Sequence, residues 1–100
     1  MTPTLPLFHR IAGRPVIVAG SGAAFEARRR MVEKAGGIVV TADDPAARLA
    51  FLTGDVVEDL AQALRGRGVL VNVADRPDLC DFLVPAVIDR NPVQIAIGTG

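Results

Sequence analysis

The amino-acid sequence predicts an α/β fold, in which a mostly parallel sheet has flanking helices and is followed by a C-terminal β-hairpin. Short apolar runs rich in Val and Ile alternate with two segments of helical periodicity, and glycines separate them. Half of the 100 residues are hydrophobic, which excludes a disordered chain. Length and composition together predict a single domain over residues 1–100.

Four apolar runs predict the strands of the sheet, and two further runs predict the hairpin. The strands are expected at residues 16–19, 38–41, 49–53 and 69–73. The hairpin is expected from runs at 83–88 and 93–97. Residues 89–92 (DRNP) lie between these two runs and are typical of a short turn.

The first helix is predicted over residues 23–35, where small and apolar side chains recur at spacings of three and four. The Gly36-Gly37 pair ends it. The side chains expected to face the sheet are Ala24, Ala27, Met31 and Ala35.

The second helix is predicted over residues 55–65, with Gly66 after its last turn. Asp55 and Glu58 have the spacing of a capping box. The side chains expected to face the sheet are Val57, Leu60, Ala61 and Leu64.

The connection between the second and third strands is unusually short. A parallel crossover normally takes a dozen or more residues and a covering helix, whereas residues 42–48 leave no room for one. Either these strands reach their places by an unusual route, or an element common in such folds is missing.

The charge and the cysteine content limit the classes of binding partner and the cellular compartment that we expect for this protein. Eleven Lys and Arg residues balance eleven Asp and Glu residues, and Trp and Tyr are absent, which excludes a basic nucleic-acid-binding protein. Residues 1–40 nevertheless carry six basic and two acidic side chains, so an anionic ligand is expected to meet this half first. A single cysteine and the lack of any apolar run of roughly 20 residues predict a cytoplasmic protein without a membrane partner.

A glycine-rich turn, Gly20-Ser21-Gly22, joins the first strand to the first helix. Glycines there allow close approach of a pyrophosphate, and the helix N-terminus supplies free N–H donors. This arrangement is typical of Rossmann-like dinucleotide-binding domains. The third small residue of that motif is replaced by Phe25. A tight turn in any α/β domain explains the glycines equally well.

An acidic pair, Asp43-Asp44, follows the second strand. An acid about 20 residues after the glycines commonly binds the ribose 2′-hydroxyl of NAD, and two carboxylates would repel the 2′-phosphate of NADP. The alternative is turn chemistry, because Asp-Asp-Pro favours a turn.

Asp75 follows the fourth strand, at the sheet edge where open α/β folds bind ligands. A carboxylate there can act as a general base; the alternative is a turn or capping aspartate. Three other features are interpreted as structural or surface features: His9 in a Pro-rich arm, Cys80 between acidic residues, and the solvated run Arg28-Arg29-Arg30.

An ordered series of short motifs runs through nearly the whole chain. The N-terminal motifs are LPLF at 5–8, GRPV at 13–16 and GSG at 20–22. The more specific series is VNVADRP at 71–77, CDF at 80–82, PAVIDR at 85–90 and IAIGTG at 95–100. In this order and spacing the motifs resemble the N-terminal domain of siroheme synthases, the precorrin-2 dehydrogenase and sirohydrochlorin ferrochelatase family.

The resemblance implies NAD-dependent oxidation of precorrin-2 to sirohydrochlorin, and iron insertion into sirohydrochlorin as a second activity. It makes Asp75 the general base of both activities and also carries a role over to Thr99. It implies a homodimer and a tetrapyrrole substrate. The cofactor-binding residues that we predict are Gly20, Ser21, Gly22, Ala23, Asp43, Thr53 and Asn72, and no metal ligand is predicted.

The sequence departs from that family at Phe25, in the short segment after the second strand, and at Gly100, where the family continues into a helical dimerisation region. We therefore expect a single NAD-binding domain that lacks this region. The alternative functions are a non-catalytic dinucleotide-binding module, either truncated or a sensor, and an S-adenosylmethionine site of the methyltransferase type.

Overall fold

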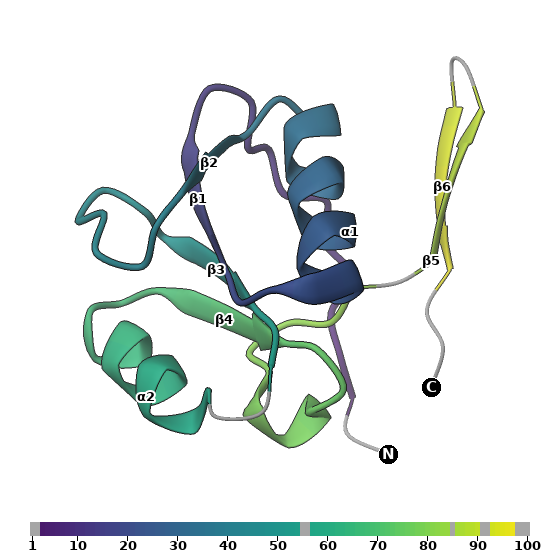
Figure 1. The fold of residues 1–100 in the computed structure, drawn as a ribbon. Coiled ribbons are helices and arrows are strands. Elements are labelled where there is room, and N and C mark those ends of the chain that lie inside the picture. The colour runs from purple at the N-terminus through teal and green to yellow at the C-terminus, as the bar shows by residue number, and fades with distance from the viewer. Residues whose placement is uncertain (1–2, 55–56, 85, 91–92, 98–100) are drawn as a thin grey trace.

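A four-stranded parallel sheet forms the centre of the protein (Figure 1). The computed structural model describes residues 3–54, 57–84, 86–90 and 93–97. The strands are β1 (Pro15–Ala19), β2 (Ile38–Val40), β3 (Leu49–Leu52) and β4 (Leu70–Val73), in the order β2-β1-β3-β4. This confirms the predicted α/β class and its parallel sheet.

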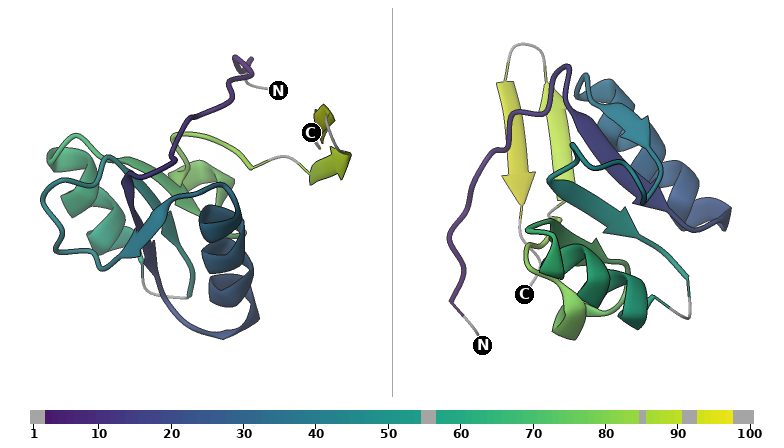
Figure 2. Two further views of the ribbon diagram at one scale, coloured as in Figure 1. Left: turned by 90° about the horizontal axis from the view of Figure 1, so that it is seen from above. Right: turned by 90° about the vertical axis from the view of Figure 1, so that its left-hand side faces the viewer.

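Two helices cover opposite faces of the sheet (Figures 1 and 2). They are α1 (Gly22–Lys34), between β1 and β2, and α2 (Glu58–Gly66), between β3 and β4. Alternation along the strands divides the core in two. Ile17, Ala50 and Val71 belong to the cluster on the α2 face, whereas Val16, Val18 and Phe51 belong to the cluster on the α1 face.

The face of α1 that meets the sheet differs from the predicted stripe. Ala24, Ala27 and Ala35 are exposed, whereas Met31 is half-buried and packs against the α1-face cluster, as predicted. Val32 is buried, and Phe25 packs against the same cluster. Burial of a Phe or Val side chain stabilises by roughly 1.5–3 kcal/mol, far more than burial of an Ala, so the helix presents these two larger residues.

The inward face of α2 is as predicted. Ala61, Leu64 and the preceding Val57 are buried, and Leu60 packs against the same core cluster. The described part of the helix begins at Glu58, with Val57 before it. Asp55, the predicted N-cap, lies outside the described residues.

The connection from β2 to β3 has no covering helix. Its short path is the unusual route that was one of the two alternatives for this segment. Residues 41–48 cross to the far side of β1 without a helix and lie on the α2 face, where Ala42 and Ala47 pack into the core. Arg67, which follows α2, holds this connection: its guanidinium donates to the carbonyl oxygens of Ala42 (2.8 Å) and Asp44 (2.7 Å).

Residues after β4 cover its free edge. The short helix η1 (Pro77–Leu79) turns the chain back, and Asp81 then pairs with Val71. The Asp81 N–H donates to the Val71 carbonyl (2.7 Å), and the Val71 N–H donates to Asp81 Oδ2 (2.8 Å). The Val73 N–H donates to Cys80 Sγ (3.2 Å), so the single cysteine has the structural role that its sequence context predicts.

Asp81→Ala is expected to lower the free energy of unfolding by about 2 kcal/mol, because it strips the Val71 N–H of its acceptor and leaves Arg65 without its carboxylate. Urea denaturation measures this change. Asp78→Ala is the matched control. It removes only an exposed ion pair with Arg76 and should cost less than about 1 kcal/mol. Equal effects would contradict the edge-covering role of Asp81.

Two further strands form a separate antiparallel sheet. β5 (Ala86–Arg90) pairs with β6 (Val93–Ile97), Ala86 opposite Ile97. β5 begins three residues after the strand predicted at 83–88, since Val84 packs instead against the α1-face cluster. The residues joining the two strands lie outside the described part of the chain. Within that part, no helix is long and apolar enough to cross a membrane.

Candidate cofactor and catalytic site

The carboxyl ends of β1, β3 and β4 lie at one edge of the sheet, called here the carboxyl edge. The strand order reverses at β1, since β2 lies on one side of it and β3 on the other. Open α/β sheets bind ligands at such a switch point. A pocket of about 260 Å³ lies here, lined by residues that follow all three strands: Ser21, Ala24, Thr53, Gly54, Ala74, Asp75 and Arg76.

Gly20 and Thr53 fit together at the floor of this site. The Thr53 N–H (3.0 Å) and Oγ1 (3.2 Å) both donate to the carbonyl oxygen of Ala19. Gly20 has φ +122°, and a Cβ added there would lie 2.0 Å from Thr53 Oγ1 and 2.4 Å from the Thr53 carbonyl oxygen. Only glycine fits this position, so the turn can lie directly against the end of β3.

The N-terminus of α1 is free to receive an anion. Ser21 precedes the helix in an extended conformation, and its side chain makes no capping hydrogen bond. The first turn contains no acidic residue, and a Cβ at Gly22 would meet open space. The first N–H groups of a helix have no intrahelical partner. This turn therefore has the donors that a pyrophosphate requires.

Phe25 occupies the position that is normally small in the glycine-rich motif. Its ring packs on the α1-face cluster. The small residue next to it, Ala24, lines the carboxyl-edge pocket instead. Ala23 is exposed within the first turn of α1.

Asp75 lies on the opposite side of the pocket from the glycine-rich turn and is exposed. Its backbone has φ +63°, the left-handed region that non-glycine residues rarely adopt. Among the described residues its carboxylate has no hydrogen-bond or ion-pair partner. Backbone strain of this kind is common at functional sites.

Arg76 anchors the loop that carries Asp75. Its guanidinium donates to Glu58 Oε1 (3.1 Å) and to both carboxylate oxygens of Asp78 (3.1 and 3.0 Å). The hydrogen bonds from Arg76 lower the pKa of Asp78, and the same partners raise the pKa of Arg76. Arg76 was not among the residues predicted for the site, although its place directly after Asp75 in the sequence indicates it.

Asn72 does not line the pocket. It lies within β4 and is buried, and its Nδ2 donates to the Phe82 carbonyl oxygen (2.9 Å), while Oδ1 has no hydrogen-bond partner among the described residues. The Phe82 ring packs edge-on against Phe51 with centroids 5.4 Å apart. Asn72 thus connects β4 to the covering segment behind the site.

The acidic pair after β2 shows the turn chemistry that was one of its two interpretations. The Thr41 hydroxyl donates to Asp43 Oδ1, which lowers the pKa of Asp43. Asp44 Oδ1 accepts from the Ala46 N–H (2.8 Å). Neither carboxylate lines the carboxyl-edge pocket. Of the predicted site residues, the pocket therefore brings together Ser21, Thr53 and Asp75, with Gly20 beneath them.

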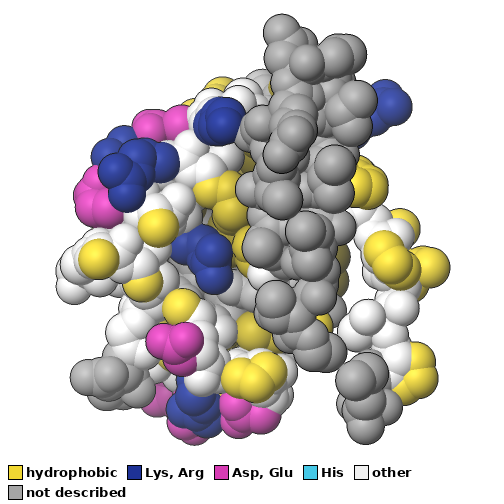
Figure 3. All heavy atoms as spheres, turned by 90° about the vertical axis from the view of Figure 1, so that its right-hand side faces the viewer, with side chains coloured by type: hydrophobic (Ala, Val, Ile, Leu, Met, Phe, Trp, Pro, Cys, Tyr) yellow, Lys and Arg dark blue, Asp and Glu magenta, His cyan; other side chains and the backbone are white. Residues whose placement is uncertain are grey.

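The basic excess of the first half is partly neutralised on the surface. Arg29 donates to Glu26 (2.5 Å) and to Glu33 (2.7 Å) along α1. On the face shown in Figure 3, basic side chains lie either beside acidic ones or singly, and they form no large patch of one sign. On the described part of that face, an anion would therefore meet individual basic side chains.

Comparison with known proteins agrees with this arrangement. Residues 47–86, which run from just before β3 to the start of β5, match a protein family described as "Putative NAD(P)-binding". A siroheme synthase of Pseudomonas paraeruginosa is 31% identical over 126 aligned positions, which cover 96% of this chain and 27% of that protein. For a siroheme synthase of Methylobacillus flagellatus the identity is 28% over 127 positions, covering 97% and 27%. For one of Methylococcus capsulatus it is 46% over 63 positions, covering 63% and 11%.

The fold and the carboxyl-edge site define an NAD(P)-binding α/β domain. The chain is a siroheme synthase-like domain, similar to one part of these longer proteins. It spans about a quarter of the length of the relatives that match nearly all of it. Their alignments are longer than the 100 residues of this chain, so these relatives contain residues within the aligned region that this chain lacks.

Proposed function

We propose that this domain catalyses the NAD-dependent oxidation of precorrin-2 to sirohydrochlorin in siroheme biosynthesis. The observation that carries the proposal is the juxtaposition of the glycine-rich turn and Asp75 across one pocket at the switch point of the sheet. The siroheme synthase relatives support the choice of a tetrapyrrole substrate. The proposed protein is a cytoplasmic homodimer, and iron insertion is a second proposed activity.

The residues at the carboxyl edge fit a dinucleotide. The position of Gly20 lacks room for a Cβ, the Ser21 hydroxyl makes no capping bond, and the N–H groups opening α1 are available to the pyrophosphate. Thr53, Ala23 and Gly22 adjoin these groups. Asp43 and Asp44 follow β2, the neighbour of β1, and lie outside the pocket itself. We propose NAD rather than NADP because the ribose of a dinucleotide that extends from the pocket toward β2 would bring a 2′-phosphate near these carboxylates, which would repel it. When bound, NAD supplies the hydride acceptor.

Asp75 is the proposed general base. Oxidation of precorrin-2 removes a hydride and protons, and a positioned carboxylate takes a proton from the substrate. The strained loop holds Asp75 toward the pocket, while Arg76 stays bound to Glu58 and Asp78. Because the Asp75 carboxylate has no protein partner among the described residues, it is available to the substrate. Asn72 is proposed to act indirectly, by fixing β4 below this loop.

A non-catalytic dinucleotide-binding module is the second candidate, and the size of the pocket favours it. At about 260 Å³ the pocket is below the roughly 300–1,000 Å³ typical of small-molecule sites. The short 41–48 connection contributes nothing to its lining. Such a module would bind NAD, and precorrin-2 would leave the affinity for NAD unchanged.

Incubation of the chain with precorrin-2 and NAD tests the proposal, with the absorption of sirohydrochlorin as the readout. Formation of sirohydrochlorin together with NADH in equal amounts is the expected result. NAD binding without turnover, and without any effect of precorrin-2 on NAD affinity, would replace the enzyme with the binding module. Omission of NAD is the control for spontaneous oxidation by air.

A further inference from the structure

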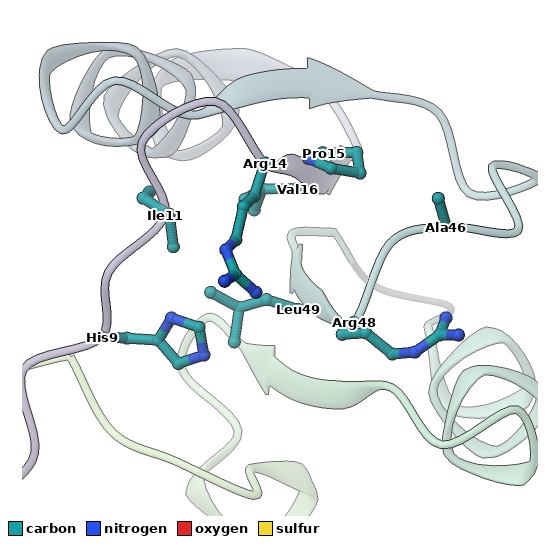
Figure 4. Close-up of a pocket in the computed structure, with 8 residues that line it drawn as sticks. All are labelled: His9, Ile11, Arg14, Pro15, Val16, Ala46, Arg48 and Leu49. Carbon is teal, nitrogen blue, oxygen red and sulfur yellow. The ribbon is translucent and has the colours of Figure 1, made fainter.

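A second pocket lies at the opposite end of the sheet, where β1 and β3 begin (Figure 4). Its apolar floor contains Ile11, Val16 and Leu49, all buried. Three basic side chains also line it, namely His9, Arg14 and Arg48. Because β1 separates it from the glycine-rich turn, this pocket is distinct from the carboxyl-edge site.

A tight turn directs Arg14 toward this pocket. The Arg14 N–H donates to the Ile11 carbonyl oxygen (2.9 Å), and Gly13 between them has φ +73°, as the third residue of a type II turn requires. The Gly13 N–H donates to the Gly36 carbonyl oxygen (2.8 Å), and the Arg14 carbonyl accepts from the Ile38 N–H (2.9 Å). These backbone hydrogen bonds and the buried Ile11 fix the position of the Arg14 backbone, from which its side chain extends.

Arg14 and His9 converge from two separate segments. Figure 4 shows the Arg14 guanidinium over Leu49, with the His9 imidazole pointing toward it. Neither side chain has a hydrogen-bond or ion-pair partner among the described residues, and no acidic side chain lines the pocket in that part of the chain. The Arg14 guanidinium, which has no counter-charge there, attracts an anion, and the imidazole that faces it adds a further polar group.

Arg48 stands at the rim of the pocket. Its Nη1 donates to the carbonyl oxygens of Pro45 and Ala47 (both 3.0 Å), and its guanidinium points away from His9 in Figure 4. It adds positive charge near the pocket without filling it. The planar guanidinium of Arg14 is therefore the group that can donate two parallel hydrogen bonds to a ligand. The buried apolar floor of the pocket lies beside it.

We propose that this amino-edge pocket binds a small organic carboxylate. The carboxylate would accept from Arg14 and face His9, and its apolar body would lie on Val16 and Leu49. A carboxylate with an apolar body fits better than inorganic phosphate, which would leave that floor uncovered. The proposal is independent of the dehydrogenase function, because the two sites lie at opposite ends of the sheet.

Titration of the ¹⁵N-labelled chain with benzoate tests the proposal by amide chemical shifts. Saturable shifts confined to residues 9–16 and 46–49 are expected, and the neutral isostere benzamide and inorganic phosphate should each bind at least about tenfold more weakly. Arg14→Gln should weaken benzoate binding by about tenfold, the loss expected for a charge-assisted hydrogen bond. Arg30→Gln, at an exposed arginine on α1, is the matched control and should change nothing.

Three outcomes would overturn this proposal. They are equal binding of benzoate and benzamide, equal or tighter binding of phosphate, and an unchanged affinity in a folded Arg14→Gln variant. If the spectrum of Arg14→Gln shows a disrupted fold, His9→Gln takes its place, and it should weaken benzoate binding severalfold. None of these results depends on whether the chain binds NAD.

Discussion

Gly20→Ala is expected to lower the free energy of unfolding by about 3 kcal/mol or more and to prevent binding at the carboxyl edge. The new Cβ would lie 2.4 Å from the Thr53 carbonyl oxygen, and no side-chain rotation relieves a clash with backbone. The left-handed φ at this position adds strain of its own, of roughly 1–3 kcal/mol. Urea denaturation gives the change in stability.

Gly22→Ala separates these two causes. Gly22 also has a positive φ, +86°, but a Cβ there would meet open space. Only the cost of the left-handed backbone then applies, about 1–2 kcal/mol. If both variants lose the same stability, the close approach of the glycine-rich turn to β3 is not what requires Gly20.

Asp75→Asn is expected to slow sirohydrochlorin formation by about 10²–10⁴-fold, the usual contribution of a general base. Asn is the right substitution because it tolerates the left-handed conformation seen at Asp75. An Asp75→Ala variant would lose the carboxylate and disturb the loop at the same time. The rate is measured at saturating NAD and precorrin-2.

NAD affinity in the same variant decides what Asp75 does. Asp75 lies across the pocket from the glycine-rich turn, so Asn should leave NAD affinity within about twofold. Equal losses of NAD affinity and rate would make Asp75 a cofactor-binding residue. Asp59→Asn, at an exposed position in the first turn of α2, is the control for loss of one negative charge.

The order of strands and helices could be predicted from the sequence because it depends on local patterns. The apolar runs that became β1 to β4 are bounded by glycines and polar residues, and the α2 stripe of Ala61 and Leu64 follows helical periodicity. The predicted stripe of α1 was wrong at its three alanines, which follow the same period as Phe25 and Val32, and right at Met31. Comparison of side-chain size as well as spacing would have favoured the two larger residues.

The contacts that complete the site depend on tertiary structure and could not be predicted in this way. Arg67 holds the 41–48 connection through carbonyl oxygens more than 20 positions earlier in the chain. Asp81 pairs with Val71 only because the chain turns back at η1 between them. Nothing in local periodicity indicates such pairs. The position of Asp75 at the carboxyl edge was predictable, whereas its left-handed backbone was not.

Calorimetric titration of the chain with NAD is the decisive measurement, since both proposed functions of the carboxyl edge require a dinucleotide there. Titrations with NADP and S-adenosylmethionine run in parallel. We expect saturable binding of NAD with one site per chain, weaker binding of NADP, and no binding of S-adenosylmethionine. Binding of S-adenosylmethionine in place of NAD, or no binding of any of the three, would contradict both proposed functions.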